Sequence, residues 1–222
     1  PRRELESTLP RGSANSGTGL VADCADALET TIIVPKSADL PAQTRRESEI
    51  AGFDAETDVL VVGLGCAGAC AAIEARSGGA EVLVLERSGA GGGTSANSGG
   101  LIYLGGGTPI QKACGFEDTP DQMYRFLTAA SGMGFQQEKI RYLCDESVAH
   151  FHWLVEQGVP FKESFYSEPG MEPPTDDCLV YSGGENGHPF NQLALPAPRA
   201  HKPRTEGAAG SLLMQCLLAA TQ

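Results

Sequence analysis

The chain has 222 residues, 41% hydrophobic and 20% charged, enough to bury the core of one large domain or two small ones. Its 28 acidic side chains outnumber 16 basic ones, and the formal net charge of -12 argues against nucleic acid as a partner. The longest uncharged apolar stretch, Val59 to Ile73, is interrupted by glycines and is shorter than the roughly 20 residues that span a bilayer, so we expect no membrane anchor.

Residues 1–55 mix Ser, Thr, Pro, Arg and Glu without sustained periodicity, apart from a short apolar patch at 31–34. This composition predicts a leader that is disordered or loosely attached. No apolar signal-peptide core follows Arg2 and Arg3. We therefore expect a cytoplasmic protein.

A regular pattern begins at Thr57. An apolar strand over 57–62 runs into the turn Gly63-Leu64-Gly65-Cys66-Ala67-Gly68, a helix over 66–76 stops at Gly78-Gly79, and a second strand over 81–85 ends at Glu86. This order is typical of a dinucleotide-binding βαβ unit, in which the helix N-terminus holds a pyrophosphate. It predicts an α/β fold with a doubly wound sheet. The alternative is a glycine-rich turn with no ligand.

Seven cysteines without a C-x-x-C pair predict neither a disulfide framework nor a zinc site, and we expect reduced thiols and no metal. Cys66 and Cys70 share one face of the predicted helix. Because Cys66 fills a position in the glycine motif where a small residue is needed, packing explains the pair better than metal binding.

A second glycine cluster follows Glu86. It reads Gly91-Gly92-Gly93-Thr94-Ser95-Ala96-Asn97-Ser98-Gly99-Gly100, and half of the 28 glycines lie between Gly63 and Gly107. Small residues and hydroxyls here would let a second segment lie along the same pyrophosphate, which suits FAD. A nicotinamide cofactor is the main rival ligand, and a flexible loop is the alternative without function.

Further helices are indicated by capping signals. Thr108-Pro109 and Thr119-Pro120 each place a hydroxyl at an N-cap and a proline at the first helical position. Residues 136–157 have helical periodicity that allows a break near Asp145, and Gly158 supplies the stop.

The last part of the chain predicts a long irregular excursion and a final helix. Residues 162–204 hold seven of the 14 prolines, and a surface position is expected for His188 and His201. A helix is expected over 211–220. Because the chain begins with Pro1 and stops directly after this helix, it looks cut at both ends.

At the second glycine cluster the sequence resembles the flavoproteins of the fumarate reductase and succinate dehydrogenase family, in which a G-G-x-[ST] segment follows the ribose acid. Within that family it is similar to the 3-ketosteroid dehydrogenases that desaturate C4–C5. The similar stretches are Gly99 to Phe116, Trp153 to Val155, Gly158 to Phe165 and Ser182 to Asn186. The resemblance implies a Rossmann-like FAD-binding domain over 56–222 that is incomplete, without the substrate domain and the C-terminal FAD segment.

The resemblance also implies a cofactor site. It assigns pyrophosphate contacts to the first glycine turn, ribose hydrogen bonds to Glu86, phosphate contacts to Thr94 and Ser95, and the isoalloxazine to the end of the second cluster. The implied cofactor-binding residues are Gly63, Gly65, Ala67, Gly68, Glu86, Arg87, Gly93, Thr94, Ser95, Ser98, Gly99 and Gly100. Respiratory members attach FAD through a histidine after the ribose acid; none occurs between Glu86 and Gln111. The resemblance therefore implies noncovalent FAD.

The implied reaction introduces a C=C bond next to the ketone of a steroid or another small ketone. It needs a base for the α-proton and a hydride acceptor, which FAD supplies at N5. Tyr103 is an acid–base candidate, although a packed strand aromatic is the favoured interpretation. His150 and His152, two apart, make a poor metal pair. The catalytic residues stay unknown.

Two alternative functions remain open from the sequence. The first is a fumarate-reductase-like flavoenzyme that reduces an activated double bond and needs clustered basic residues for a dicarboxylate. The second is a truncated flavin-binding fragment without activity.

Overall fold

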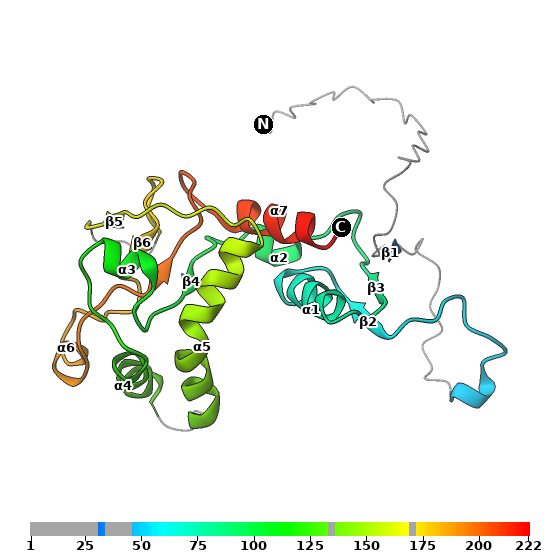
Figure 1. Cartoon of the computed structure of the whole chain (residues 1–222), viewed down its shortest axis with the longest axis horizontal. Coiled ribbons are helices and arrows are strands. Elements are labelled where there is room, and N and C mark those ends of the chain that lie inside the picture. The colour runs from blue at the N-terminus through cyan, green and yellow to red at the C-terminus, as the bar shows by residue number, and fades with distance from the viewer. Residues whose placement is uncertain (1–30, 34–45, 133–135, 169–171) are drawn as a thin grey trace, which may run out of the picture.

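The computed structural model describes residues 31–33, 46–132, 136–168 and 172–222. Figure 1 shows two groups of elements, one around a small parallel sheet and one around a second sheet with helices beside it. Helices α5 (Gln137–Glu156) and α7 (Gly210–Ala220) lie between the two groups. Within the described ranges, no helix is both long enough and apolar enough to cross a membrane.

The predicted βαβ unit is present. Strands β2 (Val59–Val62) and β3 (Val82–Leu85) pair in parallel, and helix α1 (Cys66–Ser77) connects them. Val61 and Val84 are paired and buried in the same core as α1, so one face of the sheet is covered by the helix that crosses it. The strands begin one or two residues later than predicted, and the helix stops at Gly78 as expected.

A third strand, β1 (Thr31–Ile33), pairs in parallel with β3 and gives the order β1-β3-β2. The expectation of a loosely attached leader over 1–55 is therefore wrong for these three residues. A strand this short has no readable periodicity, and its pairing uses the hydrogen-bonding groups that β3 presents at its edge. A one-turn 3-10 helix, η1 (Glu47–Glu49), lies between β1 and β2 in the sequence. The leader prediction for 1–30 and 34–45 lies outside the described residues.

Both predicted proline-headed helices are confirmed. Thr108 caps α3 (Pro109–Ala113) with a full capping box, in which its hydroxyl accepts from the Gln111 amide while the Gln111 side chain accepts from the Thr108 amide. Thr119 caps α4 (Pro120–Ser131) by accepting from the Gln122 amide. The local sequence therefore determines where both helices start.

Helix α5 runs unbroken from Gln137 to Glu156, so the predicted break near Asp145 does not occur. Arg141 forms an ion pair with Asp145 one turn later and with Asp121 of α4, which supports the helix at that point. Gly158, with a φ of 82°, follows the helix end as predicted.

The 162–204 segment contains more regular structure than its prolines predicted. It supplies β5 (Phe165–Tyr166), β6 (Leu179–Val180), β7 (Ala200–His201) and the short helix α6 (Phe190–Leu193). With β4 (Ile102–Tyr103) these strands form a sheet in the order β4-β7-β6-β5. Most of the excursion is irregular, as predicted, but these short elements were not expected, because two-residue strands paired across long separations leave no local signal.

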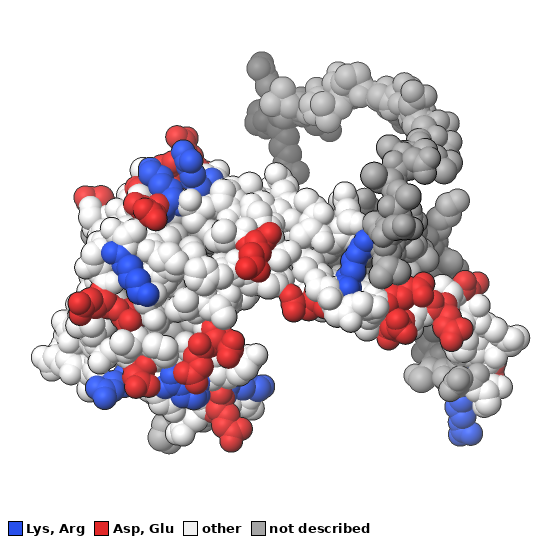
Figure 2. Space-filling view, viewed as in Figure 1, with Lys and Arg blue, Asp and Glu red and all other residues white. Residues whose placement is uncertain are grey.

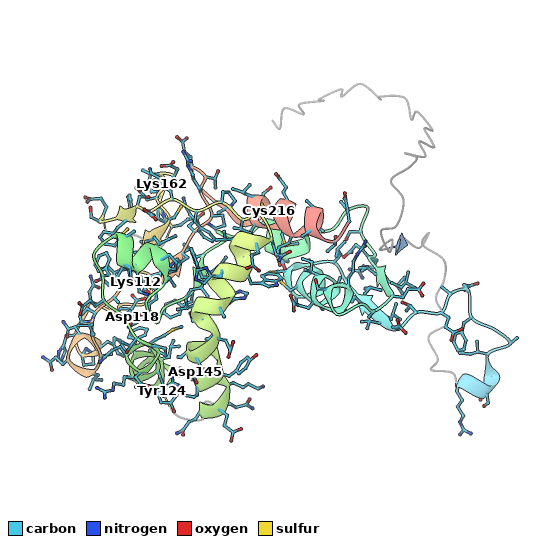
Figure 3. All side chains as sticks on the ribbon, in the orientation of Figure 1. Lys112, Asp118, Tyr124, Asp145, Lys162 and Cys216 are labelled. Atoms are coloured by element: carbon cyan, nitrogen blue, oxygen red, sulfur yellow. The ribbon has the colours of Figure 1, made fainter. Side chains whose placement is uncertain are left out.

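A buried ion pair joins the excursion to the loop between α3 and α4. Arg199 and Asp118 have fully buried side chains and are joined by two hydrogen bonds, Nε to Oδ2 at 2.9 Å and Nη2 to Oδ1 at 2.7 Å. Figure 3 labels Asp118 between these helices and the returning chain. Gly106 and Gln111 also donate to Asp118, so the carboxylate replaces its lost hydration with four hydrogen bonds.

A second buried cation, Lys202, has no carboxylate partner within salt-bridge distance among the described residues. Its Nζ donates to the carbonyls of Pro173, Thr175 and Gly207 at 2.7, 2.6 and 3.0 Å. Three donors meet three acceptors, which satisfies an ammonium group that is fully buried. This contact ties the 173–175 segment to the loop before α7.

His201 is fully buried, which corrects the surface position expected for it. Its Nε2 lies 2.8 Å from Thr108 Oγ1 and its Nδ1 lies 3.2 Å from the Arg199 carbonyl oxygen. Burial lowers the pKa of His201 to about 4. His201 is buried because it lies on β7, which pairs with β4 on one side and β6 on the other.

Because His201 is buried with a lowered pKa, we expect the folded state to lose stability in acid. The pKa of His201 is about 4 folded and about 6.5 unfolded, so the unfolded chain takes up the proton first as pH falls. We expect the free energy of unfolding to drop by up to about 3 kcal/mol between roughly pH 6.5 and 4. Urea unfolding of the wild type and His201→Gln at several pH values measures this. The stability advantage of the wild type should shrink across this window; an advantage that stays constant would contradict the prediction.

Candidate functional site

The first glycine turn brings backbone close to backbone. Gly63 follows β2 with a φ of 94°, and its amide donates to the Leu85 carbonyl at 2.7 Å. A Cβ on Gly68 would lie 1.9 Å from the Gly63 carbonyl oxygen, so only glycine fits there. The N-cap of α1, Gly65, offers no side-chain cap. The helix therefore presents its first amides at a turn that a side chain does not fill.

Glu86 faces this turn from the end of β3. Its Oε2 accepts from the Leu64 amide and its Oε1 from the Ser88 amide, each at 2.7 Å. The Ser88 amide, followed by the Leu64 amide, lowers the pKa of the Glu86 carboxyl. An ionised carboxylate with acceptor capacity left over can receive hydroxyl donors beside the turn.

The second glycine cluster folds onto the first. Gly92 and Gly93 both have positive φ, and the Gly92 amide donates to the Leu64 carbonyl at 2.7 Å. The short helix α2 (Gly93–Ala96) then places the Ser95 hydroxyl 3.2 Å from the Cys66 amide. Two segments that are 29 residues apart thus share the N-terminus of α1.

The end of the second cluster packs against α7. Gly100, with a φ of 72°, would place a Cβ 2.5 Å from Ala209 C and Gly210 N. The Ala209 and Gly210 amides donate to the carbonyls of Gly99 and Ser98 at 2.9 and 3.1 Å. Ala209 and Gly210 were missed in the sequence. Their one signal was a small residue directly before an apolar helix.

The predicted residues are only partly brought together. Gly63, Gly65, Gly68, Glu86 and Ser95 lie around one turn through the contacts above. Ala67, Arg87, Gly93, Thr94 and Ser98 are exposed nearby in the chain, and their cofactor contacts stay predictions. A carboxylate that the sequence did not signal, that of Glu172, lies 3.0 Å from where a Cβ on Gly99 would be.

Charge is sparse around these segments. On the face that Figure 2 shows, the surface over α7 carries no charged side chain, an acidic group lies below it, and most other charges lie towards the ends of the molecule. A hollow of about 250 Å³ opens beside the site. Its lining includes Leu64, Glu86, Ser88, Gly91 and Leu218.

Tyr103, His150 and His152, the candidates for acid–base or metal chemistry, pack against aromatic neighbours. Tyr103 stacks on Phe126 with ring centroids 6.3 Å apart, and burial, helped by the nearby Glu185 charge, raises its pKa. The ring therefore packs as the favoured interpretation expects, and an acid–base role for its hydroxyl stays a prediction. His150 stacks on Trp153 and His152 contacts Phe151, so their rings have separate neighbours.

A family model described as FAD binding domain matches residues 58–220. The chain belongs to this family. The match begins at the predicted first strand and covers both glycine clusters, and FAD is the cofactor that this family binds.

Several members of known sequence or structure are similar to the chain. The 3-ketosteroid-delta4-(5alpha)-dehydrogenase of Rhodococcus jostii RHA1, solved with 4-androstene-3,17-dione, is 53% identical with a TM-score of 0.78, covering 80% of this chain and 38% of that one. The 3-oxo-5-alpha-steroid 4-dehydrogenase of Comamonas testosteroni is 36% identical over 169 residues, 74% of this chain and 31% of the relative.

A flavocytochrome c3 fumarate reductase in its open conformation is 26% identical with a TM-score of 0.61, covering 77% of this chain and 26% of that one. The expected kinship with fumarate reductases and steroid dehydrogenases is confirmed. The chain spans less than two fifths of the length of each of these three relatives.

The close approach at Gly68 predicts a strict requirement for glycine. In Gly68→Ala the new methyl would meet the Gly63 carbonyl, a backbone atom that cannot move aside alone, and we expect the free energy of unfolding to fall by about 2 kcal/mol or more. Urea unfolding measures the change. Gly89→Ala is the control, because a Cβ at Gly89 would meet nothing within 4 Å. Equal stability of the two variants would contradict the described turn.

Proposed function

We propose that the chain holds FAD noncovalently through its two glycine clusters, as part of a dehydrogenase that introduces a C=C bond next to the ketone of a 3-oxosteroid. The observation that carries the proposal is the shared N-terminus of α1, where the glycine-rich Gly63–Gly68 turn meets Ser95 and faces Glu86. The 53% identity to a steroid dehydrogenase supports the substrate class.

The residues present fit the cofactor. With no side chain at Gly65, the N-cap, a pyrophosphate can approach the first amides of α1, which the α1 dipole favours. Ser95 can exchange its bond with the Cys66 amide for a phosphate oxygen. Glu86 can accept from ribose hydroxyls in the hollow beside it.

The chemistry divides between FAD and the protein. When bound, FAD supplies the acceptor for the hydride that leaves the carbon β to the ketone. The chain's own residues bind and orient it, and the sparse charge around α2 and α7 suits an apolar substrate nearby. We assign no described residue as the base.

Among the residues that the structure describes, no contact favours the fumarate-reductase-like alternative. A dicarboxylate substrate requires cationic side chains. The two fully buried cations of the described residues are both engaged, Arg199 by Asp118 and Lys202 by three carbonyls. The steroid assignment is therefore preferred.

The first test is the visible spectrum of the purified full-length gene product, before and after anaerobic addition of a 3-oxo-5α-steroid. We expect a yellow protein whose flavin bands bleach with the steroid, and whose reduced flavin is not reoxidised by fumarate. A yellow protein that fails to bleach would reject the steroid assignment, and a colourless one would reject the flavin site. Flavin that stays with the acid-precipitated polypeptide would contradict noncovalent attachment.

The ribose contact is tested separately. In Glu86→Gln one charged acceptor is replaced by an amide, and we expect FAD to bind about tenfold more weakly, as measured by quenching of flavin fluorescence. Glu81→Gln is a matched control, because Glu81 is an exposed acid just before the same strand β3. Equal losses in both variants would indicate a general charge effect and contradict a ribose contact.

A further inference from the structure

Two thiols lie together on the cofactor-binding helix. Cys66 opens α1 and Cys70 lies one turn further along, so both project from the same face. Their side chains hydrogen-bond, with Cys70 donating, which lowers the pKa of Cys66 to about 6 and raises that of Cys70. From the sequence we expected both thiols to pack. They do contact the core, yet each is only half-buried.

The other described cysteines are different. Cys178 and Cys216 donate to the backbone carbonyls of Asp176 and Gly158, each at 3.4 Å. Burial raises the pKa values of Cys114, Cys144, Cys178 and Cys216. Among the described residues, Cys66 and Cys70 are thus the thiols that hydrogen-bond to one another.

Cys70 is accessible from a neighbouring hollow. Cys70 lines a hollow of about 530 Å³ between α1 and α5, together with Glu74, Glu146, His150 and Trp153. Two carboxylates in this lining attract a cation towards the thiols. Within the described ranges, no group of three or more His, Cys, Asp or Glu side chains is arranged to hold a metal. An ion that needs three or four protein ligands therefore does not fit.

We propose that Cys66 and Cys70 form a two-coordinate site for a soft monovalent metal ion of the Cu(I) type. Thiolates select such ions, and two ligands suffice for them, whereas zinc takes three or four protein ligands. At metal–sulfur distances near 2.3 Å, two thiolates on opposite sides of one ion lie about 4.6 Å apart. Side chains one helical turn apart reach this separation by a rotation about χ1 of one of them.

The binding step balances without electron transfer. Two metal–sulfur bonds form, the two thiol protons pass to solvent, and the copper stays monovalent. The resulting unit carries one negative charge, which the positive end of α1 stabilises. The site does not depend on the proposed function.

The test is Cu(I) titration of the purified, reduced protein against a chromophoric Cu(I) chelator, under anaerobic conditions. We expect one tightly bound ion in the wild type and at least about a hundredfold weaker binding in Cys66→Ser/Cys70→Ser. The matched control is Cys114→Ser/Cys216→Ser, which removes two partly exposed thiols from other elements and should bind as the wild type does. Figure 3 labels Cys216 on α7.

Equal affinity in the two double variants, or no binding by the wild type, would overturn the proposal. X-ray absorption of the wild-type complex gives a second measurement that needs no variant. Two sulfur neighbours support the site, and three or more overturn it. FAD binding is followed in parallel, and its loss in the wild type would count against the proposed function alone.

Discussion

The structure depends on backbone segments that approach more closely than side chains allow. Helix α1 passes over Gly63 at a distance that excludes a Cβ on Gly68, and Gly100 meets Ala209 and Gly210 in the same way. Side chains at these glycines would push β2, α2 and α7 apart. The position of Ser95 at the helix N-terminus follows from this contact between main chains.

Local patterns were enough to predict the elements whose signals are local. The apolar run before the first glycine turn predicted β2 to within two residues, and the capping residues Thr108 and Thr119 predicted where α3 and α4 begin. The second sheet could not be predicted, because its two-residue strands gain order only from partners as far apart as Ile102 and His201. Strand β1 was missed for the same reason.

In the cofactor site, too, residues with a local sequence signal were predicted and residues placed by long-range contacts were not. The glycine turns and Glu86 were readable, because each serves a backbone or charge requirement visible in sequence. The approach of Glu172 to Gly99, and of Gly210 to Ser98, results from the return of the excursion and of α7. The burial of His201 depends likewise on its neighbours in the sheet. Such contacts are properties of the whole fold.

Lys202 fixes the loop after Glu172 by means that differ from the ion pair of Arg199. Its acceptors are carbonyls, which gain no proton in mild acid, whereas a link through a carboxylate weakens when that group is protonated. Burial lowers the pKa of Lys202, so the ammonium is lost at a less alkaline pH than that of an exposed lysine. The hydrogen bonds from Lys202 to this loop are therefore expected to persist in acid and to be lost in alkali.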